Sequence, residues 1–256
     1  MARLNDEHAD ARRQRELAGA ANPADFSEAL ARGLAVLSTF GAERKRMTQA
    51  DLARELGLSR ATVRRAVLTL EHLGYLSADG RTYELTPRIL ALAEGYLASN
   101  MISTIVQPVC DRLCEEFKAS SCVAVLDGAD VIMIARAVRQ SLLSLGSGVG
   151  YRVPAQSSAL GKVLLAHCTP PAPDAQGEGL DSKILNEIRH VGHCYVANDV
   201  EVGFHSIAVP IKRWDGRVVA ALNVGAAIEQ LPPEEMHGRA LDRLRQSAED
   251  LRQQLL

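Results

Sequence analysis

No apolar run in this 256-residue sequence approaches the roughly 20 residues that a helix needs to cross a bilayer. The first residues are charged where a secretory signal would carry an apolar core. Five cysteines without regular spacing do not suggest a disulfide framework, and the formal net charge is only -2. These absences predict a cytoplasmic protein with reduced thiols, and a length of 256 residues predicts about two domains.

The motifs that mark common enzymes and metal sites are also missing. The sequence has no nucleophile elbow, no phosphate-cradling glycine loop and no metalloprotease helix. His190, His193 and Cys194 form a small cluster, but a structural zinc needs four ligands and no second Cys/His pair lies near in sequence. We therefore expect no catalytic residue, no metal and no cofactor.

One enzymatic alternative stays open at this stage. Ser158 with His167 or His205 as base would make a small-molecule hydrolase, because catalytic triads are recognised by geometry and not by sequence order.

Residues 48 to 76 carry the clearest pattern in the chain, two short helices joined by a tight turn. Thr48 and Asp51 can form a capping box for the first helix, and Gly57 supplies the turn. Ser59 can cap the second helix, which carries apolar residues at three- and four-residue spacing. We expect these to face inward: Val63, Val67, Leu70 and Leu73. This spacing predicts a helix-turn-helix.

The segments on either side predict a winged form of that motif. Residues 75 to 85 alternate apolar and polar side chains about Asp79-Gly80, a strong hairpin signal. Upstream, a helix over 27 to 40 would place Leu30, Leu34 and Leu37 on one face and complete a three-helix core.

The polar face of the second helix is the candidate DNA-binding surface. Any amphipathic helix has a polar face, so this pattern alone would also describe solvated surface. The combination with a wing favours DNA, and the predicted contacts are Ser59, Arg60, Thr62, Arg64, Arg65 and Arg81. Of these, Arg64 and Arg81 would meet phosphates, and Arg60, Thr62 and Arg65 would meet bases.

Charge is distributed in the direction that this prediction requires. Residues 1 to 90 hold 14 Lys and Arg against 12 Asp and Glu, and the remainder holds 15 against 19. Arg44-Lys45-Arg46 adds to the local basic excess that a nucleic-acid surface needs. A winged-helix interaction protein that never touches DNA is the remaining alternative for this half.

Two further segments flank the predicted winged domain. Residues 1 to 25 are polar and charged, and we expect a flexible arm, with phosphate contacts by Arg12, Arg13 and Arg15 as a weaker hypothesis. Thr86-Pro87 begins a linker helix, whose apolar residues cover more than one stripe. The helix is either buried or in contact with a second chain, and paired operator half-sites would require a dimer.

The rear of the chain alternates strand hairpins with helices. Hairpins are expected over 122 to 136 and 205 to 225, and helices from Gln107-Pro108, near 158 to 167, near 182 to 191 and at the C-terminus. This order predicts an antiparallel sheet covered by helices, so the fold class is α+β.

These segments together resemble the IclR family of bacterial transcription regulators from about Phe26 to the C-terminus. The matching runs are FSEALARGLAVLSTF, the helix-turn-helix, YELTPRILALAEGYL, VAVLDGADVIMIARA, VPAQSSALGKVLLA and GFHSIAVPIKRWDGRVVAALNVGA. The opening helix and wing look closest to regulators of protocatechuate, 4-hydroxybenzoate and β-ketoadipate catabolism. After the flexible arm (1–25) expected from composition, the resemblance implies a winged helix-turn-helix domain (26–86), a linker helix (87–103) and a GAF-like effector-binding domain (104–256), assembled as homodimers or dimers of dimers.

The effector site is predicted on two grounds. Ser157 and Ser158 precede a helix start, where the backbone N–H groups of Ala159 and Leu160 favour a carboxylate. The resemblance implies that this loop, together with Ser206, Asn223 and Gly225, lines the ligand cavity. Helix capping, backbone bracing and strand packing are the structural alternatives for the serines and Asn223.

Three positions bear on how closely the chain follows the family. Arg136 at a strand end could pair with an effector carboxylate, but a surface position is the stronger expectation. Val196 stands where several relatives place a polar residue, and residues 169 to 180 look less helical than in the family.

The sequence thus predicts a DNA-binding transcriptional regulator controlled by a small aromatic or dicarboxylic acid. The identity of the effector, the operator sequence, the sign of regulation, and the choice between dimer and tetramer stay open.

Overall fold

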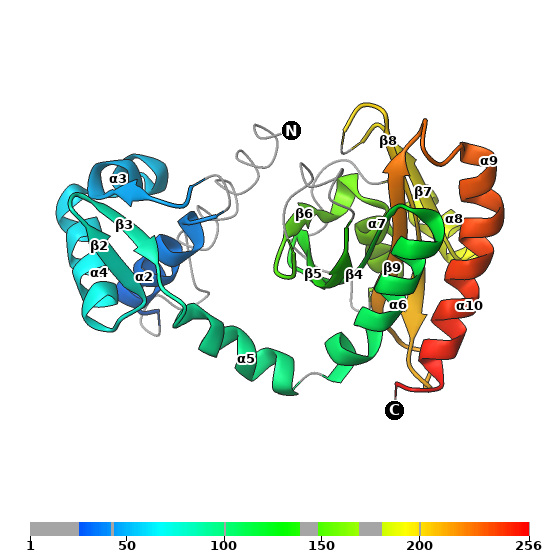
Figure 1. The fold of residues 1–256 in the computed structure, drawn as a ribbon, viewed down its shortest axis with the longest axis horizontal. Coiled ribbons are helices and arrows are strands. Elements are labelled where there is room, and N and C mark those ends of the chain that lie inside the picture. Colours follow the sequence, from blue (N-terminus) through cyan, green and yellow to red (C-terminus); the bar gives the residue numbers. More distant parts are fainter. Residues whose placement is uncertain are drawn as a thin grey trace. The chain divides into compact units, whose positions relative to one another are not determined.

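The computed structural model describes residues 26–41, 44–99, 101–138, 148–168, 181–199 and 201–255. The chain divides into two compact units, residues 1–99 and 100–256 (Figure 1). The predicted arm and the segment 169–180 lie outside the described residues.

Unit 1 contains the predicted helix-turn-helix and wing. Its elements are α2 (Glu28–Thr39), β1 (Met47–Thr48), α3 (Gln49–Leu56), α4 (Arg60–His72), β2 (Leu76–Asp79), β3 (Thr82–Leu85) and α5 (Ile89–Ser99). The unpredicted strand β1 pairs with β3, so the wing is a three-stranded sheet of order β1-β3-β2. The winged helix-turn-helix fold is confirmed.

Local chemistry sets the boundaries of α3 and α4. Thr48 Oγ1 accepts from the N–H of Asp51 at 3.1 Å, and the Asp51 carboxylate accepts from the N–H of Thr48 at 3.1 Å, so the capping box is present. Gly57 ends α3 with a φ of 64°, a left-handed conformation that favours glycine. Ser59 Oγ then accepts from the N–H of Thr62 at 3.2 Å and begins α4.

The core of unit 1 differs from the prediction on one face of α2. Leu30 and Leu34 are 63% and 55% exposed, and the helix buries Ala35, Val36 and Thr39 instead. The expectation that Leu30 and Leu34 face inward is wrong, because the smaller side chains form the face that packs against α4, whereas Leu37 is partly buried against the core.

The inward-facing apolar stripe of α4 contains one residue fewer than predicted. Val63, Val67 and Leu70 are buried as predicted, but Leu73 is 46% exposed. Leu73 is the C-cap, and the left-handed Gly74 turns the chain away immediately after it, so the last predicted core residue lies half exposed at the end of the helix.

Unit 2 is built on a six-stranded antiparallel sheet of order β6-β5-β4-β9-β8-β7. The strands are β4 (Ser120–Asp127), β5 (Asp130–Ala137), β6 (Arg152–Pro154), β7 (Cys194–Ala197), β8 (Phe204–Lys212) and β9 (Val218–Ala227). The helices are α6 (Met101–Phe117), α7 (Ala159–His167), α8 (Ser182–Val191), the short α9 (Pro233–Glu235) and α10 (Leu241–Arg252). The α+β class is confirmed.

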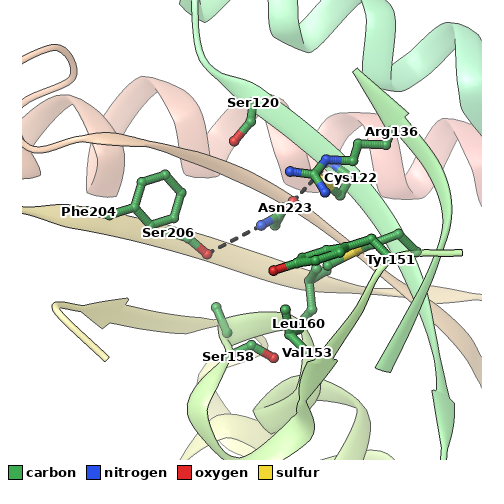
Figure 2. A pocket seen from close by; sticks show the side chains of 12 residues that line it. Ser120, Cys122, Arg136, Tyr151, Val153, Ser158, Leu160, Phe204, Ser206 and Asn223 are labelled. Atoms are coloured by element: carbon green, nitrogen blue, oxygen red, sulfur yellow. Dashed lines mark hydrogen bonds between the residues drawn. The ribbon is translucent and has the colours of Figure 1, made fainter. Parts of the chain in front are cut away.

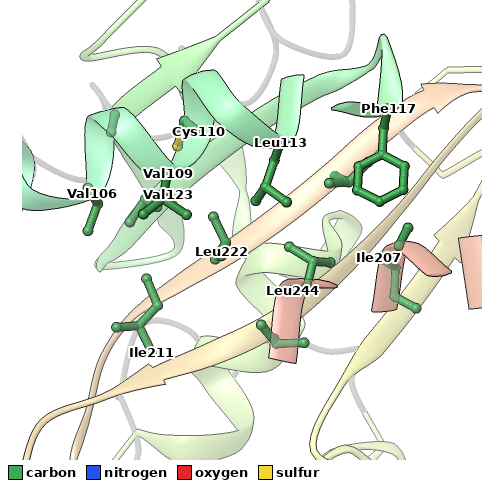
Figure 3. Packing of buried hydrophobic residues seen from close by; sticks show 14 of the residues in the cluster. Val106, Val109, Cys110, Leu113, Phe117, Val123, Ile207, Ile211, Leu222 and Leu244 are labelled. Atoms are coloured by element: carbon green, nitrogen blue, oxygen red, sulfur yellow. The ribbon is translucent and has the colours of Figure 1, made fainter. Parts of the chain in front are cut away.

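Alternating side chains divide the core of unit 2 into two layers. Val123, Ile207 and Leu222 pack with α6 and α10 on one face of the sheet (Figure 3). Their neighbours on the strands, among them Cys122 and Ala208, pack with α7 and α8 on the other face. Because strand side chains alternate between faces, Ser206 and Asn223 also belong to the α7 side.

Two helix expectations in unit 2 need correction. The helix predicted to start at Gln107-Pro108 begins at Met101, and Pro108 lies inside it. The Gln107 side chain accepts from the N–H of Arg136 and donates to its carbonyl, both at 3.1 Å, so it ties α6 to β5 and does not begin a helix. The C-terminal helix contains a π-helical segment, Met236–Ala240, before α10.

Within the described ranges, no single helix is long and apolar enough to cross a membrane. One bent pair, Ile89–Ala98 with Ile102–Phe117, passes that test on length and composition only.

Candidate DNA-binding surface and effector cavity

The exposed face of α4 carries the arginines that the sequence singles out. Arg60, Arg64 and Arg65 are exposed, and so is Arg81 at the turn of the wing. Within the described residues these four side chains form no ion pair. The hydroxyls of Ser59 and Thr62 are hydrogen-bonded to each other, with 2.9 Å between their oxygens, and Ser59 is the N-cap of α4. Its main role in this structure is therefore to cap the helix.

Two other arginines contribute less free charge than expected. Arg44 is paired with Glu55, and Arg46 binds Asp79 at 2.8 Å and Glu84 at 3.0 Å. Two of the three cations of this segment are therefore paired within the domain, while Lys45 between them is exposed, as are the arginines of α4 and Arg81.

A cavity opens in unit 2 between the start of α7 and the sheet (Figure 2). It measures about 60 Å³ as the space that the centre of a water molecule can reach, several times the roughly 10–15 Å³ that one water requires. Residues from β4, β5, β6, α7, β8 and β9 meet there. They are Ser120, Cys122, Met133, Arg136, Tyr151, Val153, Ser158, Ala159, Leu160, Phe204, Ser206 and Asn223.

Five of the seven predicted effector residues line this cavity: Ser158, Ala159, Leu160, Ser206 and Asn223. Ser157 does not, and its hydroxyl donates to the carbonyl of Pro154 at 3.4 Å. Gly225 does not line it either, but a Cβ there would come within 2.6 Å of the Phe204 ring. Glycine at this position therefore allows Phe204 to occupy the cavity wall.

Arg136 lies in the cavity, so the expectation of a surface position is wrong. Its Nε and Nη1 atoms are shielded from solvent. The guanidinium carbon lies 5.1 Å from the centre of the Tyr151 ring, within the range of a cation–π contact (Figure 2). Tyr151 is held there by backbone pairing, since the N–H of Met133 donates to its carbonyl at 2.9 Å.

The start of α7 adds a second electropositive feature. Ser158 Oγ accepts from the N–H of Gly161 at 3.0 Å, while the N–H groups of Ala159 and Leu160 precede the first intrahelical bond. A helix N-terminus favours negative charge, so this end of the cavity is suited to an anion. Cys122 stays a neutral thiol, because burial raises its pKa to about 11 despite the opposing effect of Arg136.

The hydrolase alternative does not fit this geometry. His167 lies at the far end of α7, where its Nδ1 is 2.9 Å from the carbonyl of Val163. His205 lies on the opposite face of β8 from Ser206, with its Nδ1 3.0 Å from the Tyr195 hydroxyl. Neither imidazole contacts Ser158. In the part of the chain that the structure describes, no three His, Cys, Asp or Glu side chains are grouped to hold a metal ion.

An exposed arginine face on a winged helix-turn-helix, joined to a second unit with a small cationic cavity, is the architecture of a DNA-binding regulator. Comparison with known families agrees. The IclR helix-turn-helix domain matches residues 29–80, and the C-terminal domain of the bacterial transcriptional regulator IclR matches residues 94–180 and 177–253. The chain belongs to the IclR family of bacterial transcriptional regulators, which are not enzymes.

Individual relatives agree with the predicted branch of the family. The Pca regulon regulatory protein of Pseudomonas putida is 35% identical, over 90% of this chain and 85% of its own length. The p-hydroxybenzoate hydroxylase transcriptional activator of Acinetobacter baylyi is 30% identical, over 89% and 92%. A crystal structure of an IclR homolog from Microbacterium hydrocarbonoxydans in complex with 4-hydroxybenzoate superposes with a TM-score of 0.68 at 26% identity, covering 86% of this chain and 95% of that one.

Proposed function

We propose that this regulator binds operator DNA as a homodimer, or as a dimer of dimers, and controls catabolic genes in response to a small organic acid. The relatives named above support the aromatic branch, and the cavity of unit 2 supports the effector class. The domain boundaries proposed from the sequence and the GAF-like description of unit 2 belong to this proposal.

The DNA contacts we propose are Ser59, Arg60, Thr62, Arg64, Arg65 and Arg81. Their support is that α4 presents its arginines to solvent and buries the opposite face. A recognition helix in the major groove with a wing against the backbone would place Arg64 and Arg81 on phosphates and Arg60, Thr62 and Arg65 near base edges.

The observation that carries the effector proposal is that the Arg136 side chain and the start of α7 both line the cavity. A carboxylate at Arg136 would gain a charge-assisted hydrogen bond, and the helix N-terminus adds a field that favours negative charge in the cavity. Arg136 is the one charged side chain among the twelve that line the cavity. Tyr151, Phe204 and Leu160 supply apolar walls. One cation and apolar walls favour an aromatic monocarboxylate over a dicarboxylate, whose second charge would be buried without a partner.

The dimer proposal is supported by the exposed apolar surface of α5. Leu90 is 68% exposed, and Leu92, Tyr96 and Leu97 are exposed as well. Contiguous apolar patches mark interaction sites more often than solvated surface, and a homodimer with paired recognition helices is the common solution for operator binding. The effector would act through the linker helix by favouring one arrangement of this dimer.

Calorimetric titration of the full chain tests the effector class directly. We expect 4-hydroxybenzoate and 3,4-dihydroxybenzoate to bind more tightly than adipate, and Arg136→Gln to weaken both aromatic acids about tenfold or more. Arg217→Gln is the matched control, since Arg217 lies in the exposed β8–β9 turn and pairs with Asp215. The assignment would be overturned if adipate bound more tightly than the aromatic acids, or if Arg136→Gln bound the aromatic acids as tightly as Arg217→Gln.

A further inference from the structure

The orientation of the Asn223 side chain in the cavity follows from its partners. The backbone N–H of Cys122 lies 2.9 Å from one amide atom of Asn223. A backbone N–H can only donate, so that atom must be the oxygen, Oδ1. The amide nitrogen, Nδ2, therefore faces Ser206, 3.3 Å from its Oγ (Figure 2).

This orientation fixes the role of the Ser206 hydroxyl. An amide nitrogen is also only a donor, so Ser206 Oγ accepts from Asn223 and its own hydrogen must point elsewhere. Ser206 is 5% exposed, and within the described residues no other hydrogen bond engages its Oγ. Because Ser206 lines the cavity, its O–H is available to a ligand held there.

The other two cavity serines are arranged differently. Ser158 Oγ accepts from the N–H of Gly161 and, like Ser206, keeps its hydrogen for a ligand. Ser120 Oγ donates to the carbonyl of Gly225 at 2.6 Å and presents only lone pairs. The cavity is thus richer in donors than in acceptors.

We infer that Ser206 is a specificity-determining hydrogen-bond donor and that Asn223 is the positioning residue that aims it. This inference rests on the proposed effector function and adds to it. The carboxylate binds at Arg136, and Ser206 discriminates among ring substituents by whether they can accept a hydrogen bond. A benzoate that carries a hydroxyl or methoxy substituent on the ring should therefore bind more tightly than one that carries hydrogen at the same position.

An affinity ratio isolates this effect from carboxylate binding. Benzoate and its 3- and 4-hydroxy derivatives share the same carboxylate, so the ratio of dissociation constants, benzoate over the tighter hydroxybenzoate, reports the ring end alone. For the wild type we expect a ratio of about 2 to 12, the range for one neutral hydrogen bond. Ser206→Ala should reduce the ratio to about 1, whereas the control Ser157→Ala, outside the cavity, should leave it unchanged.

A second variant tests the positioning role of Asn223. In Asn223→Asp at pH 8, one carboxylate oxygen can still accept from Cys122 while the other accepts from Ser206. The Ser206 hydrogen is then withdrawn from the cavity. The added charge weakens the binding of all benzoates alike, so the comparison is again a ratio. Here it is the affinity for a methoxybenzoate divided by the affinity for the aminobenzoate substituted at the same ring position. We expect this ratio to fall several-fold, since methoxy oxygen only accepts and the amino group mainly donates.

The outcomes separate this inference from the proposal beneath it. Thermal melts of each variant confirm folding. If benzoates bind the wild type but Ser206→Ala keeps the wild-type ratio, or Asn223→Asp leaves the methoxy-to-amino ratio unchanged, the inference is wrong while the effector class stands. If no benzoate binds the wild type, the proposed effector function itself fails.

Discussion

Arg46 offers a sharp test of how charge is arranged on the wing. It directly precedes β1, binds Glu84 on β3 and reaches Asp79 on β2, so its side chain spans the exposed face of the three-stranded sheet. The two carboxylates lie on either side of Arg81 in sequence. We predict that Arg46 screens them from the DNA backbone and that Arg46→Gln weakens DNA binding.

The magnitude follows from the exposure of the pairs and from Coulomb's law. All three side chains are 40–65% exposed, so losing both pairs should cost at most about 1 kcal/mol of stability each, and the fold should survive. Unit charges about 10 Å apart in water interact by roughly 0.4 kcal/mol. A positive charge lost opposite two or three phosphates therefore predicts roughly a four- to eightfold loss of affinity.

Fluorescence anisotropy with DNA selected from a random pool by the wild-type protein measures this loss. The effect should shrink between 50 mM and 200 mM salt, because exposed charges are screened. The triple variant Arg46→Gln, Asp79→Asn, Glu84→Gln removes the carboxylates along with their partner, which leaves the wing one unit more positive than in the wild type, and should bind DNA at least as tightly as the wild type. A triple variant that stays as weak as Arg46→Gln would refute screening and assign Arg46 a direct DNA contact.

Three other variants probe separate parts of the molecule. Arg64→Ala should flatten the dependence of log affinity on log salt by about one unit in anisotropy titrations, and an unchanged slope would remove Arg64 from the phosphate contacts. Gly161→Ala should lower the melting temperature and abolish effector binding, because a Cβ would lie 2.1 Å from the Ala155 carbonyl oxygen, whereas Gly33→Ala has open space and should be tolerated. Burial lowers the pKa of His205 below its ordinary value near 6.5, so the unfolded state binds more protons and stability should fall as pH drops below about 6.5. In thermal melts from pH 8 to 5, His205→Gln should lose less stability with falling pH than the wild type. The same loss in both proteins would contradict this prediction.

The parts of the fold that sequence predicted well are those decided by neighbouring residues. Three local signals involve residues within four positions of one another: the capping box at Thr48, the left-handed Gly57 and the Asp79-Gly80 turn. The structures they form can therefore be predicted before any packing is known. The two long hairpins of unit 2 follow from the same kind of local signal.

The errors arise where packing between distant segments decides. Leu30 and Leu34 have the right period for a core face, but the small residues around Ala35 allow closer approach to α4. Arg136 and Tyr151 meet only because β5 and the segment before β6 pair in three dimensions. Ser158 is predicted from its place before a helix start, and Ser206 and Asn223 only from the family resemblance; no single-sequence spacing links any of them to Arg136.

The affinity of the wild-type chain for its selected DNA, measured with and without saturating 4-hydroxybenzoate, tests the coupling of the two units most directly. A regulator whose cavity biases its DNA-binding state should change that affinity by about 5- to 150-fold in either direction, the usual range of allosteric coupling. Identical affinities with the acid demonstrably bound would contradict effector control of DNA binding.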